Sequence, residues 1–555
     1  MADRKQTGDI KMGKKNDNTL VKNASFLMIA ALISKIIGLI YKSPLSSTMG
    51  KESFGCFQFA QNVYFILLMI ASFSIPQAVS KIMAERLAFK RYRDAQRIFK
   101  GALLYAVIVG GAVAVFCIVG APILVPDGMA NARLALQFLA PTIFISGILG
   151  VFRGYFQAYR NMLPTSISQI LEQIAVAVVA LVMANFMVHH FADAKPDVLR
   201  SWSAAGATLG TGAGVLTALI FMLFVYQVNK KTIQRKIARD KVSVDESYKD
   251  VMKIIVMIVA PIILSAFLYN VNGYINSMIY TSVSELKGLK GSIVEGFYAE
   301  CGFFLTIINI PLTLSSTAPT SMMPEVSGAY ARGDLKTAKE KIDKATWLSM
   351  FISIPCSIGL FALAGPITAL LFPSTDGTAG FLMMLGVVTV IMNGMSNISN
   401  GVLQGIGKAN IPMIHAAIAL VFDVVVVTVL MFVTDFGIYN VVLAMIVYAL
   451  VMCILNDRAL KKELHYKNPW KTAYLPALFA AVPMGIAAFV VYQVIYMMTK
   501  ALPGGNLLAL IPAIGLGACI YFLLYLYFAK PGEEELAGLP GGRKLIQITR
   551  KLHIM

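Results

Sequence analysis

Apolar and polar residues alternate along this chain in blocks, and each apolar block is long enough to cross a membrane. A helix needs about 20 residues to span roughly 30 Å of hydrocarbon. Blocks of that length recur with short polar connections, so the pattern predicts about fourteen membrane-spanning helices. We expect them near residues 24–48, 55–80, 98–120, 133–157, 164–188, 203–228, 252–283, 297–323, 345–371, 380–404, 412–434, 438–457, 473–499 and 506–529.

The composition also indicates a membrane protein. Of the 555 residues, 57% are hydrophobic and 14% are charged, whereas soluble domains contain about 25% charged residues. No connection between the apolar blocks is long enough to form a soluble catalytic domain. We therefore predict an all-α integral membrane protein that is not an enzyme and uses no cofactor and no metal.

The formal charge of +19 is concentrated in the connections. With both termini on one side of the membrane, the tails, connections and adjoining block ends of that side hold 39 lysines and arginines, and those of the opposite side hold 7. Basic residues accumulate on the cytoplasmic side of membrane proteins, so both termini are predicted to be cytoplasmic. The basic clusters at 90–97 and 229–236 favour contact with anionic lipids over binding of nucleic acid.

Three short motifs occur twice, in the same order and 243 to 247 residues apart. The pairs are G-Y-F-Q-A-Y-R-N-M-L-P (154–164) with G-V-L-Q-G-I-G-K-A-N-I-P (401–412), G-A-P-I-L (120–124) with G-P-I-T-A-L-L (365–371), and S-I-P-Q-A-V-S-K (74–81) with T-A-P-T-S-M-M-P (317–324). An offset of six helices gives both copies the same direction through the membrane. Parallel repeats of this kind place a binding site between the two halves.

The repeat therefore predicts two parallel six-helix lobes around a central cleft, followed by two C-terminal helices. The expected order is a cytoplasmic polar tail (1–22), an N-lobe (23–228), a basic cytoplasmic linker (229–251), a C-lobe (252–460), helices 13 and 14 (461–529) and a cytoplasmic tail (530–555).

Two lysines stand inside the first apolar block, in S-K-I-I-G-L-I-Y-K-S (34–43). Lys35 and Lys42 are seven residues apart, which places them on one helix face about 10 Å apart along the axis. A lysine at the bilayer centre costs about 2.5–3.5 kcal/mol, and most such residues face a cavity or a partner. We predict that Lys35 faces the cleft and that Lys42 either does the same or reaches the interface. Such a cleft suits an anionic group.

Five other polar residues lie within the apolar blocks: Asn62, Arg153, Glu172, Glu300 and Asp423. Asn62, on the helix expected beside the first, is predicted to bind substrate in the cleft together with Lys35, Lys42 and Glu300. Arg153 either joins them there or lies at the cytoplasmic interface. Glu300 is a candidate partner of a cleft lysine or a cation site. Glu172 and Asp423 occupy corresponding helices of the two lobes, which predicts either ion pairs at the lobe interface or proton sites.

G-A-T-L-G-T-G-A-G (206–214) has the glycine content of a dinucleotide-binding loop, but it lies within an apolar block. Glycines four residues apart on a membrane helix let a second helix approach closely. We predict close helix packing at this motif.

The fourteen helices, the parallel repeat and S-K-I-I-G-L-I-Y (34–41) resemble the multidrug/oligosaccharidyl-lipid/polysaccharide exporter superfamily. I-P-Q-A-V-S-K-I-M-A-E (75–85) and R-Y-R-D-A-Q-R (91–97) are similar to its polysaccharide transporter branch, which includes the lipid II flippases and stage V sporulation protein B. The resemblance implies a bacterial cytoplasmic membrane protein that moves an undecaprenyl-diphosphate-linked saccharide by alternating access. It also implies Na+ or H+ as candidate coupling ions, and cell-envelope synthesis enzymes as candidate partners.

The resemblance implies a cationic cleft, because lipid II flippases carry cleft arginines on the first, second and eighth helices. Lys35 matches the first of these in kind, and Lys42 lies next to the position of another. The second helix here has no central basic residue, and the eighth has Glu300. The resemblance implies that the substrate is a precursor of peptidoglycan, spore cortex or a surface polysaccharide. Two alternatives fit the pattern: a cation-coupled multidrug antiporter of the same superfamily, and a non-transporting membrane scaffold for cell-envelope synthesis.

Overall fold

The computed structural model describes residues 30–244 and 246–530, without the side chains of residues 73 and 317–321. Every regular element in these ranges is a helix, as the sequence predicts. Twelve of the described helices are long and apolar enough to cross a membrane, and a bent pair brings the number to thirteen. The predicted count of fourteen is not confirmed, because the first expected span (24–48) begins outside the described residues. The tail at 1–22 lies outside them too, as does the tail at 530–555 beyond Lys530.

The chain divides into two compact units, which meet in the sequence at Ala299 and Glu300. The first unit contains a helix at 30–49, α2 (Lys51–Leu68), η1 (Met69–Phe73), α3 (Ile75–Ala88), α4 (Tyr92–Val119), α5 (Ala121–Leu124), η2 (Asp127–Met129), α6 (Ala132–Ala158), α7 (Leu163–His190), α8 (Pro196–Ala238), α9 (Tyr248–Leu286) and the beginning of α10 (Gly291–Ala331). This division assigns α9 to the first unit, whereas the sequence pattern ends the N-lobe at 228.

The second unit contains the rest of α10 and all later helices. These are α11 (Leu335–Ala362), α12 (Ala364–Leu371), α13 (Thr378–Gly386), α14 (Val388–Gly405), α15 (Asn410–Val433), α16 (Tyr439–Leu464), η3 (Trp470–Tyr474), α17 (Leu475–Thr499) and α18 (Gly505–Ala529). The bent pair is α13 and α14, whose axes differ by 42°. Its two halves together fill the expected span at 380–404.

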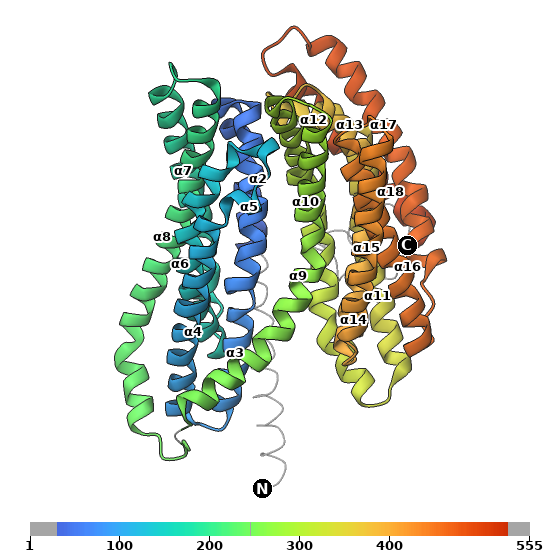
Figure 1. The fold of residues 1–555 in the computed structure, drawn as a ribbon. Coiled ribbons are helices and arrows are strands. Elements are labelled where there is room, and N and C mark those ends of the chain that lie inside the picture. Colours follow the sequence, from blue (N-terminus) through green and yellow to red (C-terminus); the bar gives the residue numbers. More distant parts are fainter. Residues whose placement is uncertain (1–29, 245, 531–555) are drawn as a thin grey trace. The chain divides into compact units, whose positions relative to one another are not determined.

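Glycines set the spacing of α7 and α8, which run side by side in the first unit (Figure 1). A Cβ atom added at Gly206, Gly210 or Gly214 would lie 2.7–2.9 Å from a backbone atom of α7. Real Cβ atoms do not come so close to backbone, so α7 occupies the space that a larger residue would need. The predicted close helix packing at this motif is confirmed.

The expected linker at 229–251 is partly helical. Helix α8 continues to Ala238, because Ile233 packs into the core of the first unit. Residues 239–247 then connect α8 to α9, and two carboxylates tie this connection to the start of α4. The Arg93 N–H donates to Asp240 Oδ2 over 2.7 Å, and the Val244 N–H donates to Asp94 Oδ2 over 3.1 Å.

The internal repeat is visible in the turns of each unit. Lys90 and Gly333, 243 positions apart in the sequence, both have a positive φ, of 60° and 77°. Arg160 and Gly407, 247 positions apart, have φ values of 58° and 81°. All four turns close with the same pair of backbone hydrogen bonds after a helix, a common helix C-terminal motif. The two copies of the repeat therefore fold alike at these turns, and the first copy places basic residues where the second has glycine.

Candidate functional site

Lys35 and Lys42 both lie on the helix at 30–49 in the first unit. Lys35 is exposed and Lys42 is half-buried, and their positive charges are close enough to act on each other. No hydrogen bond or ion pair joins Lys35 to another described residue. Seven residues are nearly two helical turns, so both ammonium groups emerge from one face.

This lysine-bearing helix packs against α7. The Ser34 hydroxyl donates to the Gln169 carbonyl over 3.3 Å. Further along the helix, Tyr41 and Leu45 are buried, whereas Ile36 and Ile40 are exposed. At 100° per residue, the lysines fall on the border between these two faces. Each can therefore present its ammonium group beside the packed surface of the unit.

Arg153 and Glu172 form an ion pair within the first unit. Arg153 Nη2 of α6 donates to Glu172 Oε2 of α7 over 2.7 Å, and Arg153 Nε donates to Ser168 Oγ over 3.0 Å. The two charged side chains are 15% and 20% exposed. The pair neutralises two of the charges that the sequence places inside the membrane. Its partners lie on consecutive helices of the same unit rather than in different lobes.

Polar side chains of α2 connect this helix to its neighbours in the first unit. Asn62 Nδ2 lies within hydrogen-bonding distance of the Gly273 carbonyl (3.3 Å), Ser277 Oγ (3.0 Å) and the Tyr298 hydroxyl (3.1 Å). Gln61 Nε2 donates to Thr211 Oγ1 of α8 over 2.7 Å. Asn62 thus joins α2 to α9 and α10, which explains why α9 belongs to the first unit.

Glu300 is fully buried in the second unit and holds the start of α13. Its carboxylate accepts hydrogen bonds from the Thr375 hydroxyl (2.6 Å) and from the N–H groups of Asp376 (3.0 Å) and Ala379 (2.8 Å). A carboxylate at a helix N-terminus satisfies free N–H groups and opposes the positive end of the helix dipole. These bonds give Glu300 a structural role in its own unit.

Asp423 lies on α15 and is also fully buried in the second unit. Glu172, on the corresponding helix of the first unit and within a turn of the matching position, is partly exposed and paired with arginine. The two acids therefore sit on corresponding helices but in different surroundings.

Sequence reasoning missed a buried acid near Glu300. Glu295 is 1% exposed and accepts hydrogen bonds from Arg200 Nη1 (2.7 Å) and Asn131 Nδ2 (2.8 Å). Helices α8 and α10 begin several residues before the apolar blocks do, so Arg200 and Glu295 were assigned to connections. Gly55 lies against the Glu295 backbone, since an added Cβ would be 1.9 Å from the Glu295 carbonyl oxygen.

Comparison with protein families gives two matches along the chain. The model of the polysaccharide biosynthesis protein family matches residues 20–323, and the MatE model matches residues 299–429. Stage V sporulation protein B of Bacillus subtilis is 23% identical over 94% of this chain and 98% of its own length. The lipid II flippase MurJ of Bacillus subtilis is 22% identical over 73% of this chain and 76% of its own.

Two solved structures share the fold. Lipid II flippase MurJ in an inward closed conformation has a TM-score of 0.64 and 13% identity, covering 90% of this chain and 98% of that one. An inward-facing multidrug resistance MATE family transporter of the MOP superfamily has a TM-score of 0.62 and 14% identity, covering 80% and 98%. Because the family model matches more than half of the chain, this protein belongs to the polysaccharide biosynthesis protein family.

Proposed function

We propose that this protein moves an undecaprenyl-diphosphate-linked saccharide across the bacterial cytoplasmic membrane by alternating access. The saccharide would be a precursor of peptidoglycan, spore cortex or a surface polysaccharide. Relatives named as a lipid II flippase and a stage V sporulation protein support this class of substrate and support a transporter rather than an enzyme. The lipid tail would remain in the bilayer while the charged head group crosses.

The observation that carries the proposal is the pair of lysines on one face of the helix at 30–49. Arg153 is already neutralised by Glu172, whereas Lys35 has no partner among the described residues. Two neighbouring ammonium groups in a membrane segment repel each other unless an anion lies between or beside them. A diphosphate offers two linked negative groups and can contact both lysines.

The remaining expected site residues take supporting roles in this proposal. Asn62, Arg153 and Glu300 position the helices of their own units through the bonds given above. Glu172 and Asp423 remain the proposed sites of coupling to H+ or Na+, because carboxylates within membrane helices are the groups that exchange such cations in membrane transporters.

A cation-coupled multidrug antiporter is the second candidate. The MatE match over residues 299–429 favours it. Such a site would recognise cationic drugs through carboxylates and aromatic rings, and the lysines at 35 and 42 would repel those ligands.

A transport assay separates the two candidates. The purified protein is reconstituted into liposomes that contain a fluorescent undecaprenyl-diphosphate sugar, and an impermeant reagent quenches the label on the outer leaflet. We expect the protein to raise the quenched fraction above the half that is accessible in protein-free liposomes. Transport of a cationic dye without any lipid movement would instead establish the antiporter.

A further inference from the structure

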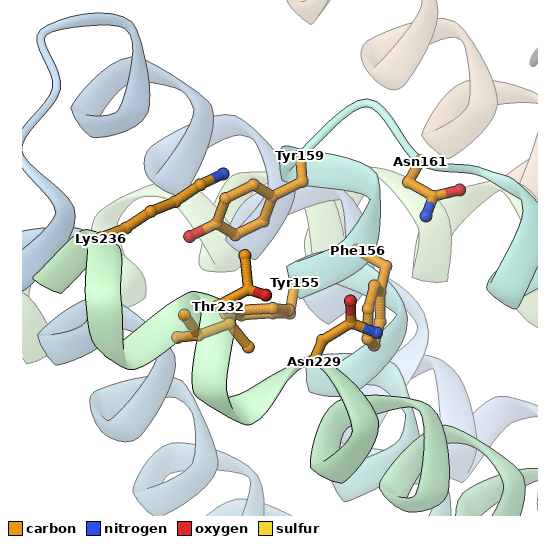
Figure 2. A pocket seen from close by; sticks show the side chains of 8 residues that line it. Tyr155, Phe156, Tyr159, Asn161, Asn229, Thr232 and Lys236 are labelled. Carbon is orange, nitrogen blue, oxygen red and sulfur yellow. The ribbon is translucent and has the colours of Figure 1, made fainter.

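Two neighbouring pockets open at the end of the first unit where the α3–α4 and α6–α7 turns meet the extension of α8. Their volumes are about 200 and 290 Å³, and Tyr159 and Lys236 line both. The first pocket also contains Tyr155, Asn229 and Thr232 (Figure 2). The second is bordered by Tyr92 and Arg160. Basic and hydroxyl-bearing side chains therefore line both pockets, and we call the two together the recess.

Lys236 is held in the middle of this recess by aromatic rings. Its ammonium group lies 5.3 Å from the centre of the Tyr159 ring and 6.0 Å from that of Tyr92. Figure 2 shows the Lys236 side chain reaching toward Tyr159, above Tyr155 and Thr232 in that view. Cation–π contacts of this kind orient an ammonium group without neutralising it. Lys236 is exposed, so its charge is accessible to an anion.

Tyr155 supplies a buried hydroxyl. The residue is 2% exposed, and its hydroxyl makes no hydrogen bond of normal geometry with the described residues, although Tyr159 lies next to it. Buried hydroxyl groups in native structures nearly always have a partner. A ligand oxygen at the base of the first pocket would provide one.

The internal repeat shows that these polar groups are not needed by the fold. The motif that contains Tyr155, Tyr159 and Arg160 has Val402, Ile406 and Gly407 at the matching positions of the second unit. The turn has the same hydrogen bonds in both copies. Glycine adopts a positive φ without strain, whereas arginine does not. The first unit thus keeps two hydroxyls and a strained arginine where the second unit folds without them.

We propose that this recess binds the phosphate of an anionic lipid head group. Ammonium, guanidinium and hydroxyl donors converge on it, and these groups together match the oxygens of a phosphate ester. The basic connections predict that this end of the unit faces the cytoplasmic leaflet, which carries anionic lipids. The site is separate from Lys35 and Lys42, and it does not depend on which substrate the protein transports.

Native mass spectrometry of the full-length protein tests the site. Phosphatidylglycerol, phosphatidylcholine, undecaprenyl diphosphate and inorganic phosphate are titrated separately against the protein in detergent. We expect phosphatidylglycerol to bind at least tenfold more tightly than phosphatidylcholine. The Lys236→Gln and Tyr155→Phe variants should each lose about tenfold in phosphatidylglycerol affinity, the loss expected for one charge-assisted hydrogen bond. Lys231→Gln, on the same exposed stretch of α8 but outside both pockets, is the matched control and should bind as the wild type does.

Arg160→Gly separates binding from folding, because it installs the residue that the second unit uses. We expect this variant to keep its thermal stability and to lose phosphatidylglycerol affinity. Equal losses in Lys231→Gln and Lys236→Gln would show diffuse charge attraction and overturn the proposal. An affinity for inorganic phosphate equal to that for phosphatidylglycerol would rule out the lipid as the ligand. The lipid would also be ruled out if the protein prefers undecaprenyl diphosphate and Lys236→Gln abolishes that preference while phosphatidylglycerol binding is unchanged.

Discussion

Arg153 and Glu172 join α6 to α7 across the intervening turn, with Arg153 Nη2 and Glu172 Oε2 only 2.7 Å apart. Both side chains are largely buried, so the charges are held by each other and by Ser168 rather than by water. The consequence for the first unit is electrostatic. This arginine is already compensated, whereas Lys35 on the neighbouring helix has no partner among the described residues and is suited to an external anion.

Removing one partner of this pair should destabilise the protein. An uncompensated charge would remain in a mostly buried position, and we expect Arg153→Gln or Glu172→Gln to cost about 2–4 kcal/mol of unfolding free energy. The double variant should recover part of that cost. Thermal unfolding of the four proteins in detergent forms a double-mutant cycle. Strictly additive losses would show that the two side chains do not interact.

Close packing of α8 on α7 should make Gly214 intolerant of even a methyl group. A Cβ there would lie 2.4 Å from Val176 Cγ2 and 2.7 Å from the Glu172 carbonyl oxygen. We expect Gly214→Ala to lower the melting temperature by several degrees, because the helices must separate. Gly515→Ala on α18 is the control, since no atom lies within 4 Å of its added Cβ. It should be neutral or slightly stabilising. The same melting temperature for both variants would refute the close-packing explanation.

Asp240 should fix the connection between α8 and α9 to the start of α4, and the stability of this contact should depend on pH. Burial alone would raise its pKa, but hydrogen bonds from the Ser243 hydroxyl and from the N–H groups of Arg93, Val242 and Ser243 hold the pKa below its usual value. A carboxyl group with a depressed pKa stabilises the fold at pH values above its unfolded pKa of about 4 and loses that contribution as the pH falls. At pH 7 the contribution is fully present.

Limited trypsin digestion at pH 7.5 measures this effect, because Arg239 and Lys241 flank the aspartate. We expect Asp240→Asn to be cut at these sites at least five times faster than the wild type. Asp193→Asn, an exposed residue elsewhere in the first unit, is the control and should not change the rate. Unchanged cleavage of Asp240→Asn would mean that other contacts hold the connection.

Periodicity in the sequence predicted the helices and the close packing at the glycine motif, because each of these depends on residues close together in the chain. The repeat seen in the sequence recurs in the turns of the two units. The partners of the charged residues were harder to predict. Arg153 and Glu172 were both identified, but their mutual contact depends on how α6 and α7 rotate, which hydropathy does not specify. Glu300 was identified as a membrane charge, and its bonds to residues 375–379 come from a turn far along the chain. The expected start of α10 was also several residues too late, so Glu295 was assigned to a connection.

The proposed transport depends on the binding of a lipid-linked diphosphate by Lys35 and Lys42. The most direct measurement is the affinity of purified wild type and Lys35→Gln for three matched lipids: an undecaprenyl-diphosphate sugar, undecaprenyl monophosphate and a neutral glycolipid. Each ammonium–phosphate contact is worth roughly 1.5–3 kcal/mol, so loss of one should weaken diphosphate binding about ten- to a hundredfold. We expect the wild type to prefer the diphosphate and Lys35→Gln to reduce this preference, rather than to lower all three affinities equally. Equal affinity of the wild type for all three lipids would contradict it.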